Sequence, residues 1–477
     1  MCYDINVEGI VMMNRSVRVV SITIENFKNV KKGNINLENK RKDYKASIVG
    51  IYGQNGSGKT ALIDAVDLLK YVLCGHKIPA KYADYVNIET DHAKLYYQFR
   101  MKCDEGIFDV WYQFCLKRAA DDTEPNIQED SASAGTRAEI FDEVLSYAFA
   151  SPSEKCRKSS LIDVREGEVF VPRAKLVELV GEKADITDLL VIKKLVRATS
   201  RAFVFSWDMI NIFRKNCKNE RYMAVIEGLR TFGVTELFVV NTENTGLISM
   251  NTLPLAFKYK EKQLIKYGSL MLPLNTPAQV PEQSMEIVRK VIDNMNIVLT
   301  QIVPGLTINI YDLGATVFAD GRPGRIVQLM SQKDGREIPF QYESEGIKKI
   351  VSILQLLIVV YNNPSITVAV DELDAGIFEY LLGEILNIIS EKGKGQLIFT
   401  SHNLRPLETL DKGFIAFTTT NPENRYIRLT NVKENNNLRD FYYRDIVLGE
   451  QSEPVYQSTN NFEIALAFRE AGEGFGS

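Results

Sequence analysis

Histidine is scarce in this chain of 477 residues, which contains only His76, His92 and His402. Nucleases of the His–metal type need histidines in clusters, and Ser–His–Asp hydrolases need one beside a nucleophile. Only His402 lies near other residues with candidate chemistry. Both classes are therefore disfavoured, and any second catalytic activity in the chain would have to use carboxylates.

Paired cysteines and long apolar runs are also missing. The six cysteines form no Cys-x-x-Cys pair, which argues against a zinc ribbon or a redox motif. They are Cys2, Cys74, Cys103, Cys115, Cys156 and Cys217. The longest aliphatic run, 350–361, contains a serine and a glutamine and is too short to cross a bilayer. The first residues lack the charged and apolar regions of a secretory signal. We therefore expect a cytoplasmic protein with no membrane partner.

The composition is that of an ordinary globular protein. Hydrophobic residues make up 45%, charged residues make up 25%, and the formal net charge is −4. At this length, two or three structural units are expected. Basic clusters at 28–45 and 258–262 could follow the phosphate backbone of DNA. Because the overall charge is acidic, solvated charged faces are the favoured interpretation, with a basic groove at a dimer interface as the alternative.

Residues 53–60 match the phosphate-binding loop pattern G-x-x-x-x-G-K-[ST]. The loop consists of Gly53, Gln54, Asn55, Gly56, Ser57, Gly58, Lys59 and Thr60. An apolar run at 46–52 predicts a buried strand before it, and apolar residues at helical spacing follow it. In this context backbone N–H groups and a helix N-terminus cradle phosphates, Lys59 contacts the β- and γ-phosphates, and Thr60 holds Mg²⁺. An accidental glycine turn is the alternative, which the strand and helix on either side disfavour.

Two further motifs follow apolar strands far downstream. The strand at 366–370 runs directly into Asp371 and Glu372. Beside a phosphate loop, the first carboxylate would support Mg²⁺ and the second would orient or deprotonate the attacking water. The next strand, 397–401, leads into His402, which could contact the γ-phosphate. Solvated strand ends are the alternative, but the order of these motifs after the loop favours catalysis.

Ser344 and Gly346 precede a long predicted helix at 347–361. Ser344 is a good N-cap, and the N–H groups that follow it form a second phosphate-sized anion site. Within one chain the phosphate loop already covers that side of a nucleotide. We therefore expect this site to act across a dimer interface, with a plain helix cap as the alternative.

The motifs at 53–60, 344–346, 371–372 and 402, in that order, resemble the ABC-type ATPase heads of the SMC, RecF and OLD (overcoming-lysogenization-defect) branch. The opening segment 24–29 looks like that branch's first strand. The resemblance covers roughly 17–116 and 305–417. It implies that Lys59 and Thr60 bind phosphate and Mg²⁺, that Asp371 supports Mg²⁺ and that Glu372 activates water. It also implies that Ser344 and Gly346 complete a partner subunit's site, that His402 is the switch histidine, and that Lys28 and Asn29 flank the base.

The match departs from the family pattern at several points. The signature helix begins Glu-Ser-Glu-Gly rather than Leu-Ser-Gly-Gly, and Phe378 stands where SMC heads place an aspartate. Gln98 and Gln113 are both candidates for the Q-loop residue. No nuclease module of the OLD type is recognised after the head. The chain thus resembles stand-alone phage-defence ATPases such as the AriA subunit of PARIS or the PtuA subunit of Septu.

This resemblance implies an ATPase that uses ATP and Mg²⁺, slowly or under regulation, as a sensor and scaffold in anti-phage defence. ATP would join the heads into a homodimer or higher homo-oligomer. A phage trigger protein would then release a separate nuclease or toxin effector. Two alternatives remain, namely a DNA-binding repair or recombination ATPase of the RecF type and a transporter's nucleotide-binding subunit, which the large insertion disfavours.

The expected fold is α/β, a P-loop NTPase of ABC-ATPase type with a mixed sheet, flanking helices and a mainly helical insertion. A β-hairpin is expected at 93–116, and helices are expected at 191–204 and 284–303. The expected divisions are a flexible leader at 1–16, the N-terminal half of the head at 17–117, a linker and mainly helical insertion at 118–304, the C-terminal half of the head at 305–417 and an extension at 418–477.

Overall fold

The structure is a computed structural model, and it describes most of the chain. The described residues are 15–38, 47–120, 135–165, 173–181, 186–241, 252–261, 264–430, 437–449 and 451–473. Almost all of the leader expected at 1–16 lies outside these ranges. The same holds for Lys40, Arg41, Lys42, Lys45 and the lysine side chains of 258–262, which belong to the two basic clusters.

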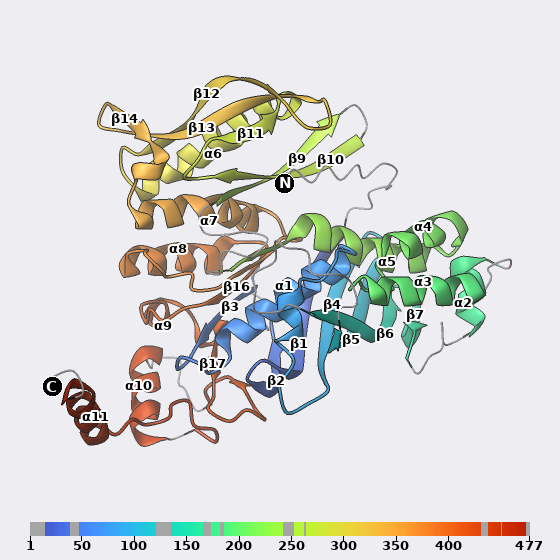
Figure 1. Cartoon of the computed structure of the whole chain (residues 1–477), viewed down its shortest axis with the longest axis horizontal. Helices are drawn as coiled ribbons and strands as arrows, with labels where there is room; N and C mark the ends of the chain where they lie inside the picture. The colour runs from blue at the N-terminus through green and yellow to red at the C-terminus, as the bar shows by residue number, and fades with distance from the viewer. Residues whose placement is uncertain are drawn as a thin grey trace.

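A mostly parallel sheet of six strands carries the phosphate loop (Figure 1). Its order is β18-β17-β3-β16-β15-β8, and only the β17–β18 pair is antiparallel. Its strands are β3 (Ser47–Tyr52), β8 (Leu237–Val240), β15 (Thr367–Val370), β16 (Gln396–Thr400), β17 (Ile415–Thr418) and β18 (Tyr426–Ile427). The five parallel strands are buried along their whole length, which explains why their sequences are continuous rather than alternating apolar runs.

Helices cover both faces of this sheet. Helix α1 (Lys59–Leu73) lies on one face. The core on the opposite face includes residues from α7 (Glu345–Asn362), α8 (Glu379–Lys392), α9 (Pro406–Thr409) and α10 (Leu438–Leu448). Because side chains alternate along a strand, Val49 and Ile51 of β3 pack in the α1 core, whereas Ile48 and Tyr52 pack in the α7 and α8 core. The sheet therefore separates two hydrophobic cores.

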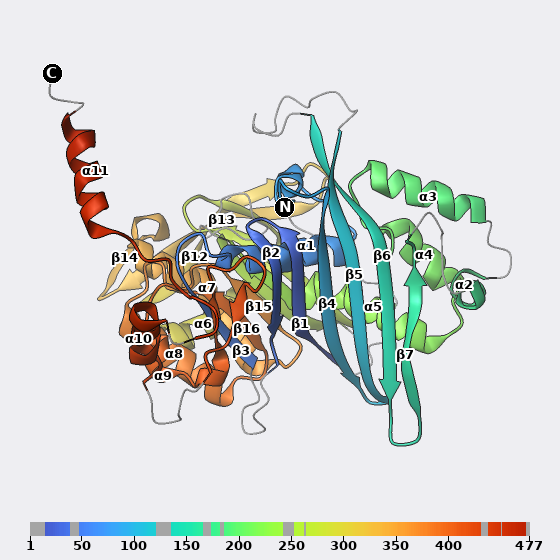
Figure 2. The same ribbon diagram turned by 90° about the horizontal axis from the view of Figure 1, so that it is seen from below.

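A second, antiparallel sheet packs against the other side of α1 (Figure 2). Its order is β2-β1-β4-β5-β6-β7. Its strands are β1 (Arg15–Phe27), β2 (Val30–Asn36), β4 (His92–Cys103), β5 (Gly106–Ala120), β6 (Thr136–Ala150) and β7 (Lys155–Asp163). The β4–β5 pair confirms the expected hairpin. Since α1 lies between two sheets, it is apolar around most of its surface rather than along one stripe.

Residues 118–304 were expected to be mainly helical, and the described part of this region forms strands as well as helices. Strands β6 and β7 extend the antiparallel sheet, and β8 forms the edge of the parallel sheet. The alternation of β6 was obscured because Glu143 points into the core, where its carboxylate accepts hydrogen bonds from Phe203 N (2.5 Å), Val204 N (3.1 Å) and the Tyr112 hydroxyl (2.7 Å). The other elements of this region are α2 (Arg173–Val180), α3 (Ile186–Ala198), α4 (Trp207–Asn216), α5 (Glu220–Thr231), β9 (Thr252–Glu261), β10 (Leu264–Pro273), β11 (Ala278–Pro281) and α6 (Met285–Ile302).

A smaller antiparallel sheet lies above α7 in Figure 1. It joins β11, β13 (Pro323–Lys333) and β12 (Thr307–Val317) in that order, and β14 (Arg336–Pro339) pairs with β13. A bulge between Asp312 and Gly314 shifts the register of β12 without ending the strand.

Gln396 joins the two large sheets. Its Oε1 accepts a hydrogen bond from Val19 N (2.8 Å), and its Nε2 donates one to Val19 O (2.7 Å). The amide thus pairs with both backbone groups of a residue in β1, as a neighbouring strand would. Gln396 is 1% exposed, so these bonds form in a water-excluded environment. This contact fixes β1, and with it the segment at 28–29, relative to the parallel sheet.

The C-terminal helix α11 (Asn461–Glu473) projects away from the body (Figure 2). Phe462 and Phe468 are each 76% exposed. Within the described ranges, no helix has both the length and the apolar character needed to span a membrane.

Candidate functional site

The carboxyl ends of β3, β15 and β16 meet at a cleft of about 450 Å³. Their register brings these ends together, since Thr400 pairs with Ile51 and Phe399 pairs with Val370. The cleft is lined by Lys28, Asn29, Asn55, Gly56, Gly58, Lys59, Thr60, Ala61, Asp371, Glu372, Thr400 and His402. It thus unites the loop at 53–60 with the acidic pair and the histidine that the sequence singled out.

Lys59 lies at the start of α1 with its side chain folded over the loop. Its Nζ donates hydrogen bonds to Gly53 O (2.8 Å) and Gln54 O (3.1 Å). Burial lowers the pKa of Lys59, and the nearby carboxylates of Asp371 and Glu372 oppose that shift. A phosphate in the cleft would offer Lys59 a charged acceptor in place of two neutral carbonyls.

Three loop residues lie outside the cleft lining and shape the loop instead. Gly53 has φ +153°, and a Cβ at this position would stand 1.8 Å from Thr418 Oγ1. The Ser57 hydroxyl bonds Thr418 Oγ1 and Gln54 O. The Gln54 side chain accepts a hydrogen bond from Gln457 N (2.9 Å). The loop is therefore held from behind by β17 and by the C-terminal extension.

Thr400 organises the acidic pair and was not identified from the sequence. Its hydroxyl donates to Asp371 Oδ1 (2.6 Å) and accepts from Glu372 N (2.8 Å). Glu372 has φ +48°, an uncommon conformation for a residue with a side chain. Asp371 is buried, whereas Glu372 opens into solvent and the cleft. The signal for Thr400 was its position at the end of the apolar strand that precedes His402.

Asp374 fixes the backbone around His402. Its Oδ2 accepts hydrogen bonds from His402 N (3.1 Å) and Asn403 N (2.9 Å). The His402 side chain is exposed and lines the cleft. The segment after β15 and the segment after β16 are therefore linked directly at the cleft edge.

The sheet order and the cleft together decide the fold. The chain has the fold of a P-loop ATPase of the ABC type, with a parallel sheet that carries the loop and an antiparallel sheet that packs across α1. Residues 21–128 match the family model of an AAA domain.

Solved structures similar to this chain include SMC heads and RecF. An SMC head bound to the C-winged helix domain of ScpA has 13% identity and a TM-score of 0.38, covering 86% of this chain and 97% of that chain. The SMC head domain from Thermotoga maritima has 13% identity and a TM-score of 0.34, covering 86% and 99%. RecF with ATP has 13% identity and a TM-score of 0.34, covering 81% and 94%. A search among curated proteins finds no match.

Lys28 and Asn29 form one wall of the cleft in this ATPase fold. Lys28 pairs with the buried Asp64 of α1, and its Nζ stands 3.9 Å from the centroid of the Tyr85 ring. The Asn29 side chain bonds Gly56 O of the loop. Arg425 Nη2 donates to Asn29 O (2.6 Å), a contact that the sequence did not indicate.

Ser344 and Gly346 do not line this cleft. Ser344 is exposed, and its hydroxyl caps α7 by accepting from Ile347 N (3.3 Å). Gly346 packs tightly against the segment after the acidic pair, because a Cβ there would lie 2.5 Å from Gly376 O. The N-terminus of α7 therefore faces outward, while its first turn touches the chain that follows Glu372.

Lys349, one turn into α7, faces the acidic groups. It is 3% exposed, and burial lowers its pKa to about 8, while the charges of Asp374, Glu372 and Asp371 oppose the shift. The helix that carries Ser344 is thus coupled to the acidic pair both by packing and by charge.

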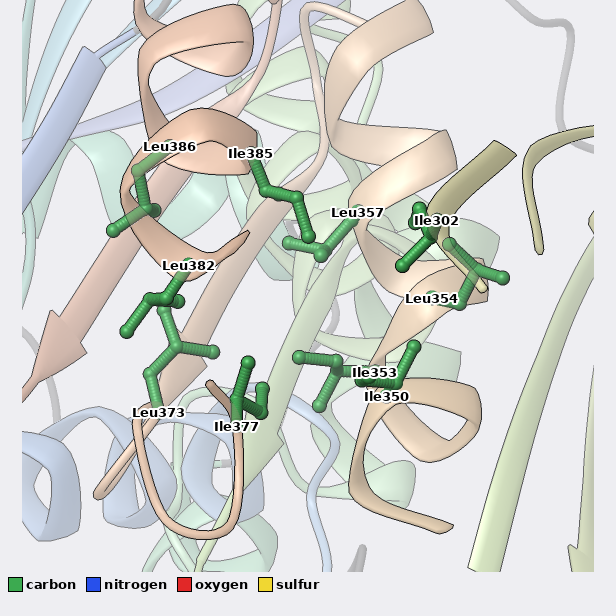
Figure 3. A pocket seen from close by; sticks show the side chains of 10 residues that line it. All are labelled: Ile302, Ile350, Ile353, Leu354, Leu357, Leu373, Ile377, Leu382, Ile385 and Leu386. Carbon is green, nitrogen blue, oxygen red and sulfur yellow. The ribbon is translucent and has the colours of Figure 1, made fainter. Parts of the chain in front are cut away.

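Below this contact, α7 and α8 enclose a small apolar cavity (Figure 3). Its volume is about 10 Å³, and its lining includes Ile350, Ile353, Leu373 and Ile377. No polar side chain lines it, so it cannot hold a water with hydrogen-bond partners. It is a gap in the packing between α7 and α8 rather than a second ligand site.

The two Q-loop candidates lie away from the cleft. Gln98 of β4 and Gln113 of β5 both point to the outer face of the antiparallel sheet. Neither lines the cleft that holds Lys59, so neither could contact a ligand bound there in this conformation.

Proposed function

We propose that this chain is an ATP-hydrolysing switch in which two copies close around ATP and Mg²⁺. The supporting observation is that the predicted site residues lie in two separate places. The loop, the acidic pair and His402 share one cleft, whereas Ser344 and Gly346 lie outside it on an exposed helix N-terminus. A second copy could place that N-terminus over the phosphates of the first.

The residues in the cleft suit ATP and Mg²⁺. Mg²⁺ prefers oxygen ligands and is usually bound through one or two carboxylates plus substrate phosphates. Thr60 and Asp371 offer a hydroxyl and a carboxylate at the cleft, and would hold the ion, which neutralises charge on the phosphates. Glu372, whose carboxylate is open to the cleft, is placed to accept a proton from the attacking water.

Trans-complementation tests this arrangement. Ser344→Asp keeps a good N-cap but places a negative charge where a partner's phosphate would lie. We expect the variant to bind ATP, remain monomeric with ATP and Mg²⁺, and lose hydrolysis. Lys59→Ala should lose both ATP binding and hydrolysis. A 1:1 mixture should recover up to about half of the wild-type rate, because only the mixed dimer can close and it contains one intact site of two.

The readouts are mass by light scattering, binding of a fluorescent ATP analogue and phosphate release. Ser344→Thr is the matched control, since it keeps the cap without adding charge. A Ser344→Asp variant that hydrolyses ATP at the wild-type rate, or a mixture with no recovered activity, would show that the site is complete within one chain.

We further propose that the switch acts as a sensor and scaffold in anti-phage defence and controls a separate nuclease or toxin. The support is the resemblance of the motif series to stand-alone phage-defence ATPases. Cells that carry the chain with its neighbouring genes should resist phage. Lys59→Ala and Glu372→Gln should each abolish that resistance while the protein stays folded. Resistance that survives both changes contradicts the proposal.

A DNA-binding repair or recombination ATPase is the second candidate. Two described members of the basic cluster at 28–45 are neutralised, since Lys28 pairs with Asp64 and Lys31 pairs with Glu89 (2.6 Å). These pairs favour a solvated charged face over a DNA groove. ATP-dependent binding of duplex DNA by the isolated protein, with a steep salt dependence, would favour the repair function instead.

A further inference from the structure

The outer face of the antiparallel sheet carries a shallow pocket that the ATPase site does not use. Its volume is about 290 Å³, and Figure 2 shows its strands β1, β4, β5 and β6 lying in front of α1 and α5. The inner face of the same strands is a hydrophobic core. The solvated face of such a sheet is normally polar, so a hollow that combines partly exposed aromatic rings and amides with the charged Glu25 and Lys158 requires an explanation.

Strand register arranges the pocket side chains in two adjacent rows. One row runs Ser21, Gln98, Trp111 and Ser146 across β1, β4, β5 and β6. The other runs Thr23, Tyr96, Gln113 and Val144 across the same strands. Register shifts lie next to the rows, at 19–21 of β1, at 113–115 of β5 opposite 141–144 of β6, and at 160–162 of β7 opposite 145–146 of β6. Bulges bend strands, which accounts for the hollow.

Trp111 and Tyr96 provide flat aromatic surfaces in this hollow. Both are partly exposed, although residues of their size are usually covered. The Nζ of Lys158 lies 4.2 Å from the centroid of the Trp111 ring. A planar ring could displace this flexible cation, because base–aromatic stacking is generally the stronger contact at an exposed site.

Amide groups beside these rings have unused hydrogen-bonding capacity. Gln113 forms no side-chain hydrogen bond to another described residue, and the Gln98 amide receives only a long bond from Ser21 Oγ (3.4 Å). Each amide offers two donors and an acceptor at fixed positions. Such groups can read the edge of a base stacked on Trp111.

A row of cations borders the pocket along β7. Lys155, Arg157 and Lys158 are exposed, and none forms an ion pair with another residue that the structure describes. The nearest acidic residue in sequence, Glu154, is already paired with Arg221 (2.5 Å). This edge therefore carries uncompensated positive charge in a chain whose net charge is −4.

We propose that this face binds an unpaired stretch of single-stranded nucleic acid. Bases stack on Trp111 and Tyr96, Gln98 and Gln113 contact their edges, and phosphates follow the cations of β7. Open sheets with aromatic residues on adjacent strands bind unpaired bases in this way. A duplex keeps its bases stacked and hidden, and a neutral saccharide would leave the β7 cations without a role. This binding does not depend on ATP hydrolysis.

Trp111 fluorescence gives a direct test. The chain has two tryptophans, so Trp207→Phe leaves Trp111 as the only reporter. Labelled oligo(dT) and oligo(rU) of 20 nucleotides, a 20-base-pair duplex, UMP and maltoheptaose would be titrated separately, about 20 being enough to span a typical single-strand site. We expect the single strands to quench Trp111 and to bind more tightly than the duplex. Trp111→Ala should weaken binding about tenfold, and Trp111→Phe should weaken it less.

Lys158→Ala should weaken binding and reduce the slope of log K against log salt by about 0.7, the value expected for one phosphate contact with a single strand. Binding of a fluorescent ATP analogue should be unchanged in the Trp111 and Lys158 variants, and Lys59→Ala should keep strand binding. Three results would overturn the proposal: tighter binding of the duplex, binding of the saccharide instead, or single-strand binding that Trp111→Ala leaves unchanged.

Discussion

Thr400→Val isolates one hydroxyl that holds the acidic pair in place. The substitution keeps the branched shape of the side chain and removes only the group that bonds Asp371 Oδ1 and Glu372 N. Thr400 is 1% exposed, so water cannot easily replace those bonds. Each unpaired buried group costs about 1–3 kcal/mol. We therefore expect the free energy of unfolding to fall by about 2–6 kcal/mol, the sum for two groups.

The effect on hydrolysis has a separate cause. The bond to Glu372 N helps to hold that residue at φ +48°, and small misplacement of a catalytic group can lower a rate by about 100-fold. Urea unfolding monitored by circular dichroism would measure the stability of the variant, and phosphate release at saturating ATP would measure its rate. ATP binding through Lys59 should persist, which separates loss of positioning from loss of the site.

Thr400→Ser is the matched control, because it keeps the hydroxyl and loses one methyl group. It should retain most of the hydrolysis rate. A Thr400→Val protein with wild-type stability and rate would refute the reasoning, since the two bonds would then contribute nothing. Equal losses in the Ser and Val variants would assign the effect to packing of the methyl group instead.

Three further predictions concern stability. Gln396→Leu should lower the free energy of unfolding by about 2–6 kcal/mol, because it leaves the N–H and C=O of Val19 unpaired. Gln396→Glu can restore only the bond from the N–H, so urea unfolding should show a smaller loss of stability in this variant. Burial lowers the pKa of Lys349 to about 8 in the folded chain. Between pH 8 and 10.5 the unfolded chain therefore binds more protons than the folded chain, and stability should rise with pH. Melting temperatures across this range should rise less in Lys349→Met than in the wild type. Truncation after residue 459 should leave the melting temperature unchanged, because α11 is exposed. Truncation after residue 449 should lower the melting temperature, because it also removes the buried Val455. Equal melting temperatures for the two truncations would contradict this prediction.

The nucleotide cleft could largely be predicted from the sequence because its parts follow local rules. A glycine loop between a strand and a helix, and acidic residues at the end of an apolar strand, are recognisable within short windows. Parallel strands then bring their carboxyl ends together whatever their distance along the chain. Lys59, Asp371 and His402 were located in this way.

The contacts that position the cleft could not be predicted, because they depend on pairing between distant segments. Thr400 became visible only when the register of β16 placed it beside Asp371. Arg425 and Gln457 approach the loop from the C-terminal extension, and no local pattern marks them. Strand β6 was missed for a related reason, since a buried carboxylate is satisfied by N–H groups sixty residues away in sequence.

Charge gives an independent reason to expect a second subunit over the cleft. Asp371, Glu372 and a nucleoside triphosphate all carry negative charge, and Mg²⁺ offsets only part of it. Of the two lysines that line the cleft, Lys28 is already paired with Asp64, which leaves Lys59 and the N-terminus of α1 to face the phosphates. The N-terminus of α7 has the required positive potential, but it points outward from its own chain. If a second copy placed this N-terminus over the phosphates, its positive potential would offset their negative charge, and it would do so only when ATP is bound. Gly346 and Lys349 of that second copy would then transmit the contact to its own segment after Glu372. In the proposed dimer, closure of one site would thus be linked to the acidic pair of the other.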